Sequence, residues 1–483
     1  MRFVLKETRL GLRNSKTRIP FRYGAACLTC CPQVVLRVTI DVDGQSHVGF
    51  SGDCLPPGWF DKVSGKDYAR QIDDMLAVIG LAEETYLDEV SSAVEFFPAW
   101  LAVYQEVHRR AAERGWNGLL ASFGVSMVER AVMDALARAA GLGFAQAVRQ
   151  NIYAIEAGLV HAELAGLAPA DWLPTRPSDR VFVRHTVGLG DPIREVDVAP
   201  DERLDDGFPQ SLEQSIQQAG IRYFKIKVSN NLDHDRQRLT AIAKVIERQL
   251  GEDYKVTLDG NEQYKNAADF DALVNVLETD AALGSLWRNT LAIEQPLDRA
   301  ISLDPAHTLG IRQLASRKPV IIDEADGDLA SYPRALETGY RGVSSKNCKG
   351  PVKSLLNAGL TWLRNDRGRR HEYLMTGEDL CTVGVIPVQS DLCLVATLGL
   401  SHVERNGHHY HPGLSYLPEA DQEAALQAHG DLYARQHNRI APLVRNGQFE
   451  IQSLQCLGFG FAVEPQMDTL QSPQDWEFAS LGL

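Results

Sequence analysis

From residue 181 onward, short apolar segments alternate with longer amphipathic ones, and this alternation constrains the fold more than any other feature of the sequence. Eight segments have the length and apolar content of strands, and most are separated by segments with helical spacing, such as residues 235–250. The candidate strands are residues 181–187, 223–228, 254–259, 291–294, 319–323, 342–346, 372–376 and 401–405. Strands that alternate with helices pair in parallel, so these units predict an α/β fold with a closed (β/α)8-type barrel of about 250 residues.

The first 180 residues follow a different pattern. Residues 33–42 alternate apolar and polar side chains, and the alternation resumes after a break at Asp43 and Gly44, which predicts a β-hairpin. From about residue 67 to residue 150 the spacing is helical, most clearly in residues 124–141. A proline-bearing stretch that ends at Arg180 separates the two patterns. We therefore expect an α+β domain over residues 1–180 and a barrel domain over residues 181–439.

The charge balance and the hydropathy exclude several classes of function. The chain has 63 acidic and 49 basic side chains, which give a formal net charge of -14. No lysine or arginine cluster stands out, so we expect no nucleic-acid partner. The N-terminus lacks the features of a secretory signal, and no segment approaches the ~20 apolar residues that a spanning helix needs. We expect a cytoplasmic protein without a membrane partner.

The cysteines are too sparse for a disulfide scaffold, because only eight occur in 483 residues. Cys27, Cys30 and Cys31 form the single cluster, and no distant pair accompanies them. A zinc site is one interpretation of this cluster. The favoured interpretation is that these cysteines are small hydrophobic side chains beside a loop.

Lysines end the second candidate strand of the barrel. Lys225 and Lys227 are two residues apart, so their side chains point to the same side of the strand. Apolar residues flank both lysines, which favours an inward orientation over a pair on an exposed edge. Active sites of such barrels lie where the strands end, so two ammonium groups are expected there.

Carboxylates end the next three candidate strands. Asp259, Glu294 and Asp323 each follow an apolar run, and three successive acids at one rim are hard to explain as helix caps. Converging carboxylates repel one another unless a cation neutralises them, and an all-oxygen set selects Mg2+, with Mn2+ as the alternative. Glu324 follows Asp323 directly and is an alternative ligand in its place.

Lys346 ends the sixth candidate strand, on the other side of the acids from Lys225 and Lys227 if the strands follow in order around a barrel. A basic group is then expected on each side of a bound substrate. Burial and neighbouring cations disfavour the ammonium form of lysine, which would allow general-base catalysis. A divalent ion on a substrate carboxylate would stabilise the enediolate that forms when the neighbouring proton leaves.

These residues, in this order, resemble the enolase superfamily, and within it the branch of the mandelate racemase and muconate lactonizing enzyme family that uses lysines on strands two and six. The motifs DGNEQY, IEQP and IIDE are weak singly and specific in combination. The resemblance implies catalytic roles for Lys227, Lys346 and Lys225, with Lys227 as the usual base. It implies metal ligands at Asp259, Glu294 and Asp323.

The same resemblance implies that the N-terminal α+β domain caps the barrel, and that residues 440–483 complete this cap. Cap loops around residues 21–24 and 54–59 would then close over the site. Candidate substrate contacts are Tyr23, Trp59, Asn261, Glu324 and Glu378. The sequence KGP after Lys346 departs from the glycine pair that is common in that family.

Several polar residues near the rim have less specific interpretations. Glu378 and its neighbour Asp379 are expected to cap a helix, with a substrate contact as the alternative. The segment with His408, His409 and His411 is expected to be an exposed loop, since adjacent histidines seldom bind one ion. His185 is expected in the core or beside the substrate and not as a catalytic acid.

The favoured function is racemisation or epimerisation of a small carboxylate substrate, in which one lysine removes the α proton and the other returns one. Lyases of the same family are the nearest alternative, among them acid-sugar dehydratases, cycloisomerases and enzymes similar to o-succinylbenzoate synthase. A barrel that binds a ligand without turnover is a third hypothesis. Relatives in this family often assemble, so a homo-oligomer is also expected.

Overall fold

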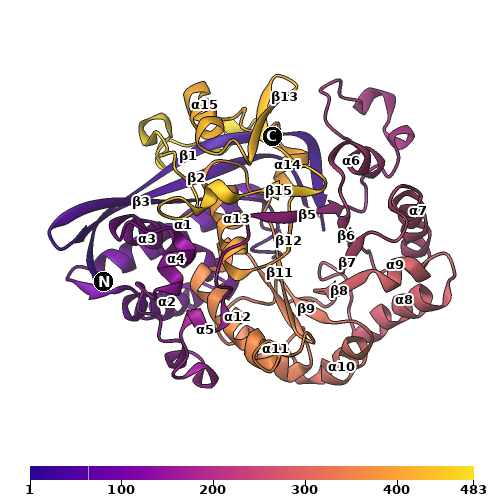
Figure 1. Cartoon of the computed structure of the whole chain (residues 1–483), viewed down its shortest axis with the longest axis horizontal. Coiled ribbons are helices and arrows are strands. Elements are labelled where there is room, and N and C mark those ends of the chain that lie inside the picture. The colour runs from indigo at the N-terminus through magenta and orange to yellow at the C-terminus, as the bar shows by residue number, and fades with distance from the viewer. Residues whose placement is uncertain (25, 64) are drawn as a thin grey trace.

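The structure is a computed structural model that describes residues 1–24, 26–63 and 65–483. Its centre is a closed barrel of parallel strands (Figure 1). The strands are β5 (Arg180–Val187), β6 (Tyr223–Lys227), β7 (Lys255–Asp259), β8 (Thr290–Glu294), β9 (Val320–Ile322), β10 (Gly342–Ser345), β11 (Leu374–Gly377) and β12 (His402–Glu404). Neighbours in sequence pair in this order, and β12 pairs with β5 to close the barrel. The predicted (β/α)8-type barrel and its eight strands are confirmed.

Helices surround the barrel, as its alternating pattern predicts. They are α6 (Leu212–Ala219), α7 (Leu232–Leu250), α8 (Ala267–Thr279), α9 (Gly284–Arg288), α10 (Thr308–Arg317), α11 (Ser331–Thr338), α12 (Pro351–Arg364) and α13 (Ile386–Leu398). Two further helices follow the last barrel strand: α14 (Gly407–Tyr410) packs on the N-terminal strand, and α15 (Glu419–Ala428) packs on the hairpin of residues 433–442. Helix α7 is an example of how the sequence specifies these helices. At the start of α7, the side chain of Asn231 accepts a hydrogen bond from the backbone nitrogen of His234. Along α7, Leu239, Ile242 and Ile246 lie on one face and are buried.

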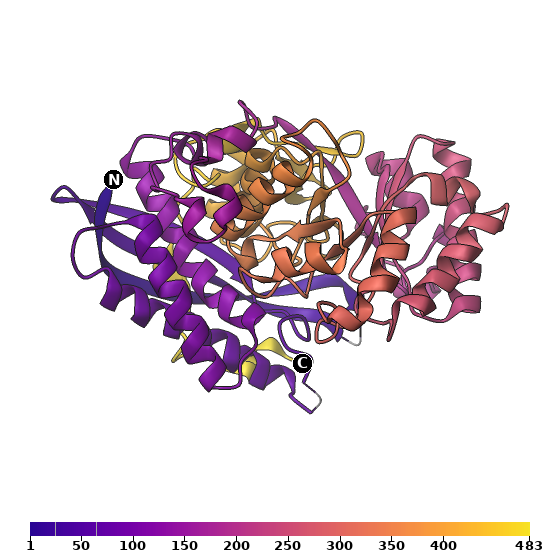
Figure 2. The same ribbon diagram turned by 90° about the horizontal axis from the view of Figure 1, so that it is seen from below.

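The N-terminal region is a four-stranded antiparallel sheet covered by helices. Its strands are β1 (Arg2–Tyr23), β2 (Ala26–Val42), β3 (Gln45–Cys54) and β4 (Val94–Glu95), in the order β3-β2-β1-β4. The helices are α1 (Tyr68–Glu89), α2 (Phe96–Glu113), α3 (Gly118–Ala139) and α4 (Phe144–Arg149). Figure 2 shows the long indigo strands extending from these purple helices to the barrel. The predicted hairpin at Asp43 and Gly44 is confirmed, with both residues at positive φ, whereas β1 was not predicted as a separate strand.

Helix α3 joins the cap sheet to the barrel. It approaches β3 so closely that a Cβ on Gly49 would lie 2.2 Å from the backbone oxygen of Ala131, so only glycine fits there. On its other side, Ser126 Oγ donates a hydrogen bond to the backbone oxygen of Cys348 over 3.1 Å. Glu129 accepts one from the backbone nitrogen of Val352 over 2.7 Å. Helix α3 therefore holds the loop that follows Lys346.

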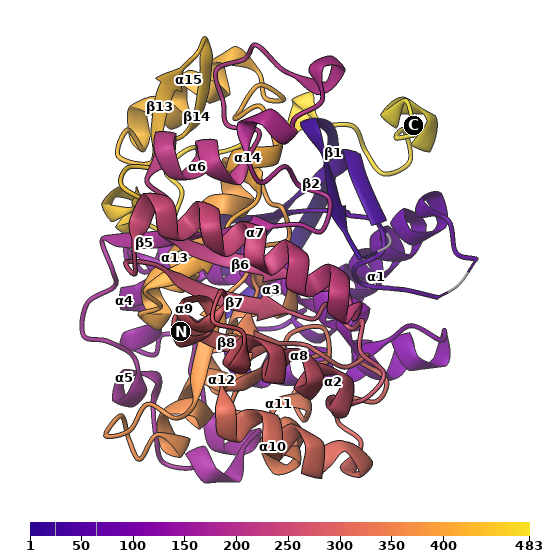
Figure 3. The same ribbon diagram turned by 90° about the vertical axis from the view of Figure 1, so that its right-hand side faces the viewer.

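The chain after the barrel returns to both regions. Strands β13 (Tyr433–Gln436) and β14 (Arg439–Pro442) form a hairpin, and β15 (Gln448–Glu450) pairs antiparallel with β5. Further on, Gln471 exchanges backbone hydrogen bonds with Leu12 of β1, and Figure 3 shows the C-terminal segment beside that strand. The division of the chain into domains at residues 180 and 440 stays a prediction. In the described part of the chain, no helix combines the length and the apolar character needed to span a bilayer.

Candidate active site

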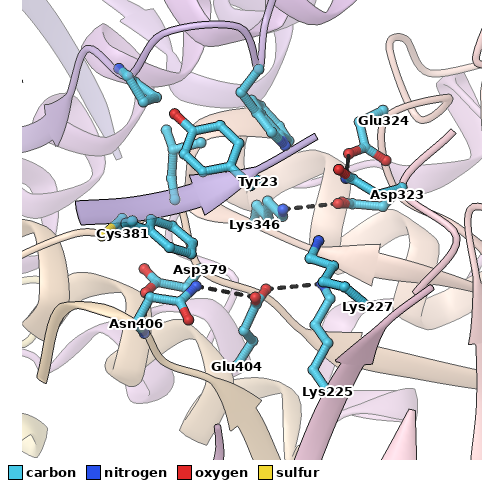
Figure 4. Close-up of a pocket in the computed structure, with 15 residues that line it drawn as sticks. Tyr23, Lys225, Lys227, Asp323, Glu324, Lys346, Asp379, Cys381, Glu404 and Asn406 are labelled. Atoms are coloured by element: carbon cyan, nitrogen blue, oxygen red, sulfur yellow. Dashed lines mark hydrogen bonds and ion pairs between the residues drawn. The ribbon is translucent and has the colours of Figure 1, made fainter. Parts of the chain in front are cut away.

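A cavity lies at the carboxyl ends of the barrel strands, beneath the cap (Figure 4). Its lining residues are Phe21, Tyr23, Pro56, Trp59, Lys225, Lys227, Asn261, Asp323, Glu324, Lys346, Asp379, Leu380, Cys381, Glu404 and Asn406. The three predicted catalytic lysines are among them, and so are most of the predicted substrate contacts. Two predicted metal ligands, Asp259 and Glu294, lie directly behind this lining and contact its lysines.

Lys225 is the centre of a buried group of carboxylates. Its Nζ lies 2.6 Å from Glu294 Oε1, 2.8 Å from Glu378 Oε2, 3.0 Å from Glu404 Oε2 and 3.2 Å from Asp259 Oδ2. These acids come from β7, β8, β12 and the end of β11, so four strands place an oxygen around one ammonium group. Burial by itself would lower the pKa of Lys225, but Glu294 and the other carboxylates raise it well above its ordinary value.

One cation does not neutralise all of these acids. Burial and the neighbouring Glu378 carboxylate raise the pKa of Glu294 well above its ordinary value. Within the described residues, Glu294 Oε2 is buried and has no hydrogen-bond partner. This part of the site therefore has an excess of carboxylate oxygens over donors.

Lys227 and Lys346 reach the cavity from different strands and each pairs with an acid. Lys227 Nζ donates to Asp259 Oδ2, and Lys346 Nζ donates to Asp323 Oδ2 over 2.8 Å. Figure 4 shows both ammonium groups entering the space below Tyr23. Lys346 also lies over Trp59, with 4.6 Å between Nζ and the ring centroid, a cation–π contact that favours the ammonium form.

The protonation state of these lysines differs from the sequence-based expectation. Burial does act to lower their pKa values, but Asp259 raises the pKa of Lys227 and Asp323 raises that of Lys346. The sequence-based expectation considered neighbouring cations and not these direct carboxylate partners, which act in the opposite direction. A general-base role for either lysine therefore stays a prediction.

The two adjacent acids after β9 have different surroundings. Asp323 accepts from Lys346 and Lys349, whereas Glu324 accepts from Asn261 Nδ2 over 3.0 Å. Glu324 Oε2 is buried and has no partner within the described residues. Burial, with the nearby Asp323 carboxylate, raises the pKa of Glu324 to about 7.

The roof of the cavity comes from the cap. Phe21, Tyr23, Pro56 and Trp59 line it, and all four lie in or beside the two cap loops predicted to close over the site. Tyr23 donates its hydroxyl hydrogen to the backbone oxygen of Pro57 over 2.7 Å. The described roof therefore presents mainly aromatic surface to the cavity.

Two predictions about strand-end acids need correction. Glu378 lies beneath the cavity and not in its lining, because it pairs with Arg184 and Lys225 inside the barrel. Asp379 lines the cavity and accepts from the backbone of Thr382 and of Asn406. These acids hold the barrel interior and a loop together, so helix capping was the wrong interpretation.

The histidine segment also differs from its prediction. His408 and His409 belong to α14 and His411 follows it, and His409 and His411 are buried where an exposed loop was expected. His185 is buried against His409, with 4.8 Å between the ring centroids, which agrees with the core alternative. Burial lowers the pKa of His411 to about 4, so it is neutral at pH 7.

No preformed metal cluster exists in the described ranges 1–24, 26–63 and 65–483. There, no three His, Cys, Asp or Glu side chains are placed so that they could hold an ion. Cys27, Cys30 and Cys31 are part of β2 and are free. The predicted metal ligands are instead separated by the lysines that pair with them.

Several residues of the site were not predicted from the sequence. Glu404, Asn406, Cys381 and Leu380 line the cavity, and Lys349 pairs with Asp323 behind it. Glu404 is the last residue of β12 and the penultimate residue of the eighth predicted strand, so the strand-end criterion applied to the other acids points close to it. The remaining residues lie in loops after strands, where the sequence offers no comparable signal.

Comparisons with known proteins give matches by structure. No protein-family model matches the sequence, and no curated protein matches it. The chain is similar to 2-chloromuconate cycloisomerase from Rhodococcus opacus 1CP, with a TM-score of 0.61 and 14% identity over 97% of this chain and 99% of that one. It is similar to dipeptide epimerase from Enterococcus faecalis V583, complexed with Mg and the dipeptide L-Leu-L-Tyr, with a TM-score of 0.59 and 13% identity over 95% and 99%.

A third similar structure is a mandelate racemase/muconate lactonizing protein from Herpetosiphon aurantiacus, with a TM-score of 0.58 and 16% identity over 96% of this chain and 99% of that one. These matches span nearly the whole length of both partners, so they include the cap as well as the barrel. The chain therefore has the fold of the enolase superfamily, in the form found in the mandelate racemase and muconate lactonizing enzymes.

Proposed function

We propose that this protein is a divalent-metal-dependent enzyme that removes the proton beside a substrate carboxylate, and that it acts as a racemase or epimerase. The observation that carries the proposal is the placement of Lys227 and Lys346, which enter one cavity from β6 and β10. A substrate between them would have a proton acceptor and a proton donor within reach. The fold of known racemases and epimerases supports the same reaction class.

The acids of the site have the ligand chemistry of a hard divalent ion such as Mg2+, and they could hold one once the lysines between them move aside. All are oxygen donors, and the buried oxygens Glu294 Oε2 and Glu324 Oε2 have no partner within the described residues. Asp259, Glu294 and one of the adjacent acids Asp323 and Glu324 would hold the ion. When bound, it would supply the positive charge that stabilises the substrate carboxylate as the α proton leaves.

The lysines would divide the proton transfer between them. A base must be neutral, so Lys227 can accept a proton only when Asp259 no longer stabilises its ammonium form. Lys346 keeps its proton through Asp323 and the Trp59 ring, and it can donate this proton to the other face of the substrate. Lys225 neutralises the acids behind the cavity and holds them together.

One observation favours a second candidate, a cycloisomerase or another lyase. Asp323 Oδ2 and the aromatic face of Trp59 both stabilise the ammonium form of Lys346. A lysine held in this way could steady the enediolate by its charge without exchanging a proton. Lys227 would then be the single base, as a one-base elimination or cycloisomerisation requires.

An exchange assay tests the proposal. The protein is incubated with Mg2+ in deuterium oxide and a library of 2-hydroxy acids, amino acids, dipeptides and aryl-substituted carboxylic acids, and incorporated deuterium is detected by mass. We expect incorporation at the α carbon of one class, and loss of incorporation with EDTA. Silence across the library, with Mg2+ present and the fold intact, would favour a barrel that binds without turnover.

A further inference from the structure

Asp323, a predicted metal ligand, is already saturated by cations of the protein itself. Its Oδ2 accepts from Lys346 over 2.8 Å, and its Oδ1 accepts from Lys349 over 2.9 Å and from Ser344 Oγ. The carboxylate is 2% exposed. Each oxygen thus has an ammonium partner, and a metal ion would have to displace at least one of them.

Lys349 cannot be displaced easily. It is 1% exposed and is fixed by the backbone oxygen of Asp323 over 2.6 Å and by Ser344 Oγ over 2.8 Å. The loop that carries it is itself held by cap helix α3 through Ser126. Removing one partner of a buried ion pair leaves an uncompensated buried charge and is strongly destabilising. The Asp323–Lys349 pair is therefore a permanent part of the barrel wall.

Glu324, the next residue, has the opposite surroundings. It is 2% exposed and lines the cavity, and its Oε2 has no hydrogen-bond partner within the described residues. Its Oε1 accepts from the side chain of Asn261, whose backbone nitrogen donates to Asp259 Oδ1 over 2.7 Å. Asn261 thus connects Glu324 to another predicted ligand, and Figure 4 shows Glu324 beyond Asp323 at the same side of the cavity.

We infer that Glu324, and not Asp323, joins Asp259 and Glu294 as the third protein ligand of the divalent ion, and that Lys349 withholds Asp323 from the ion. This inference rests on the metal-dependent function proposed above. The buried oxygens without partners, on Glu294 and Glu324, are the ones that a cation would satisfy. Lys349 begins the sequence KGP, which replaces the glycine pair that is common at this position in the family that the sequence resembles.

The test is Mn2+ binding measured directly, by the loss of the free-ion EPR signal on titration of the full-length protein. Glu324→Gln should weaken binding by more than the ~10–100-fold that loss of an outer-shell partner typically costs. Asp323→Asn should change it by less than ~10-fold. Asp328→Asn is the matched control, because it changes an acid of the same loop that accepts from the backbone of Ala330 and from Ser331 Oγ and does not line the cavity, and it should bind Mn2+ as the wild type does.

A double variant keeps the test decisive if Asp323→Asn fails to fold. Lys349→Met releases Asp323 from its second ammonium partner, so Glu324→Gln combined with Lys349→Met should recover much of the Mn2+ affinity that Glu324→Gln loses. No recovery in a folded double variant would overturn the inference. An equal or greater loss in Asp323→Asn than in Glu324→Gln would also overturn it.

This readout separates the ligand assignment from the proposed reaction. A wild type that binds Mn2+ with the expected order of variants, yet exchanges no substrate hydrogen, supports the assignment while the proposed reaction fails. A wild type that binds no Mn2+ overturns the assignment and the metal dependence together.

Discussion

The floor and the roof of the cavity differ in the chemical character of their side chains. The floor comes from the ends of the barrel strands and is ionic, with Lys225, Lys227, Lys346 and Glu404 in or beside paired charges. The roof comes from the cap, and its described lining is apolar or aromatic. The floor thus holds the groups that are proposed to move protons and bind a cation, whereas the roof offers shape and exclusion of water. We therefore expect the reaction class and the substrate choice to be separable in this molecule.

The largest expected effect on stability comes from removing the central cation of the floor. Lys225→Met leaves Glu294, Glu378 and Glu404 without their shared ammonium partner, and breaking such a buried group should cost ~3–5 kcal/mol of unfolding free energy. Urea unfolding in EDTA measures this. Lys244→Met, an exposed change on α7, is the control and should stay within ~0.5 kcal/mol. A loss below 1 kcal/mol for Lys225→Met would show that the floor is not held together by this lysine.

Protonation of His185, a buried histidine of barrel strand β5, should have the next largest effect. Burial lowers the pKa of His185 to about 4, below the ~6.5 of an unfolded chain, so the unfolded state binds the proton first as the pH falls. Its contribution to stability is complete above pH ~6.5, is lost between pH ~6.5 and ~4, and amounts to about 3 kcal/mol.

Unfolding free energies at pH 7 and pH 5 for the wild type and for His185→Gln check this effect. The variant should lose less stability on acidification than the wild type. Equal losses would mean that His185 is not buried in its neutral form. The comparison isolates this histidine from the ionic floor, because both proteins keep the same lysines and carboxylates.

A change in the roof should have the smallest effect on stability and a selective effect on turnover. Trp59→Leu removes the aromatic face over Lys346, a contact worth about 0.5–2 kcal/mol. We expect kcat/KM to fall by ~10-fold for the substrate that the exchange assay identifies. In the pH profile of kcat/KM, the apparent pKa of the limb that reports Lys346 should also fall, because the ammonium form loses a partner. An unchanged pH profile would assign Trp59 to packing alone.

The floor could be predicted from the sequence and the roof only in outline. Lys225, Lys227 and Asp259 end apolar strands, and because strand order determines where each strand end lies around a barrel, one pattern located them all. The same reasoning overlooked Arg184 and Glu404, although both lie on correctly predicted strands. Side chains alternate between the two faces of a strand, so this alternation also predicts that Arg184 and Glu404 point into the barrel. It was used for Lys225 and Lys227 but not for the strands that carry Arg184 and Glu404.

Features that depend on contacts between distant segments were beyond the sequence pattern. Strand β1 has many charged side chains and only partial alternation, and it is a strand because β2 pairs along most of its length. His409 is buried because α14 packs against β1 and β5. The pairing of Asp323 with Lys349 depends on the turn after β10. Each of these requires the folded barrel and cap as context.

The most direct test of the central claim is α-hydrogen exchange from each enantiomer of the substrate, in deuterium oxide, by Lys227→Ala and Lys346→Ala. If the two lysines act on opposite faces, each variant should lose exchange from one enantiomer by ~10²–10⁴-fold and keep part of the exchange from the other. Loss of exchange from both enantiomers in Lys227→Ala alone, with Lys346→Ala still active on one, would indicate a single base and the lyase alternative. Exchange that survives unchanged in both variants would contradict the account.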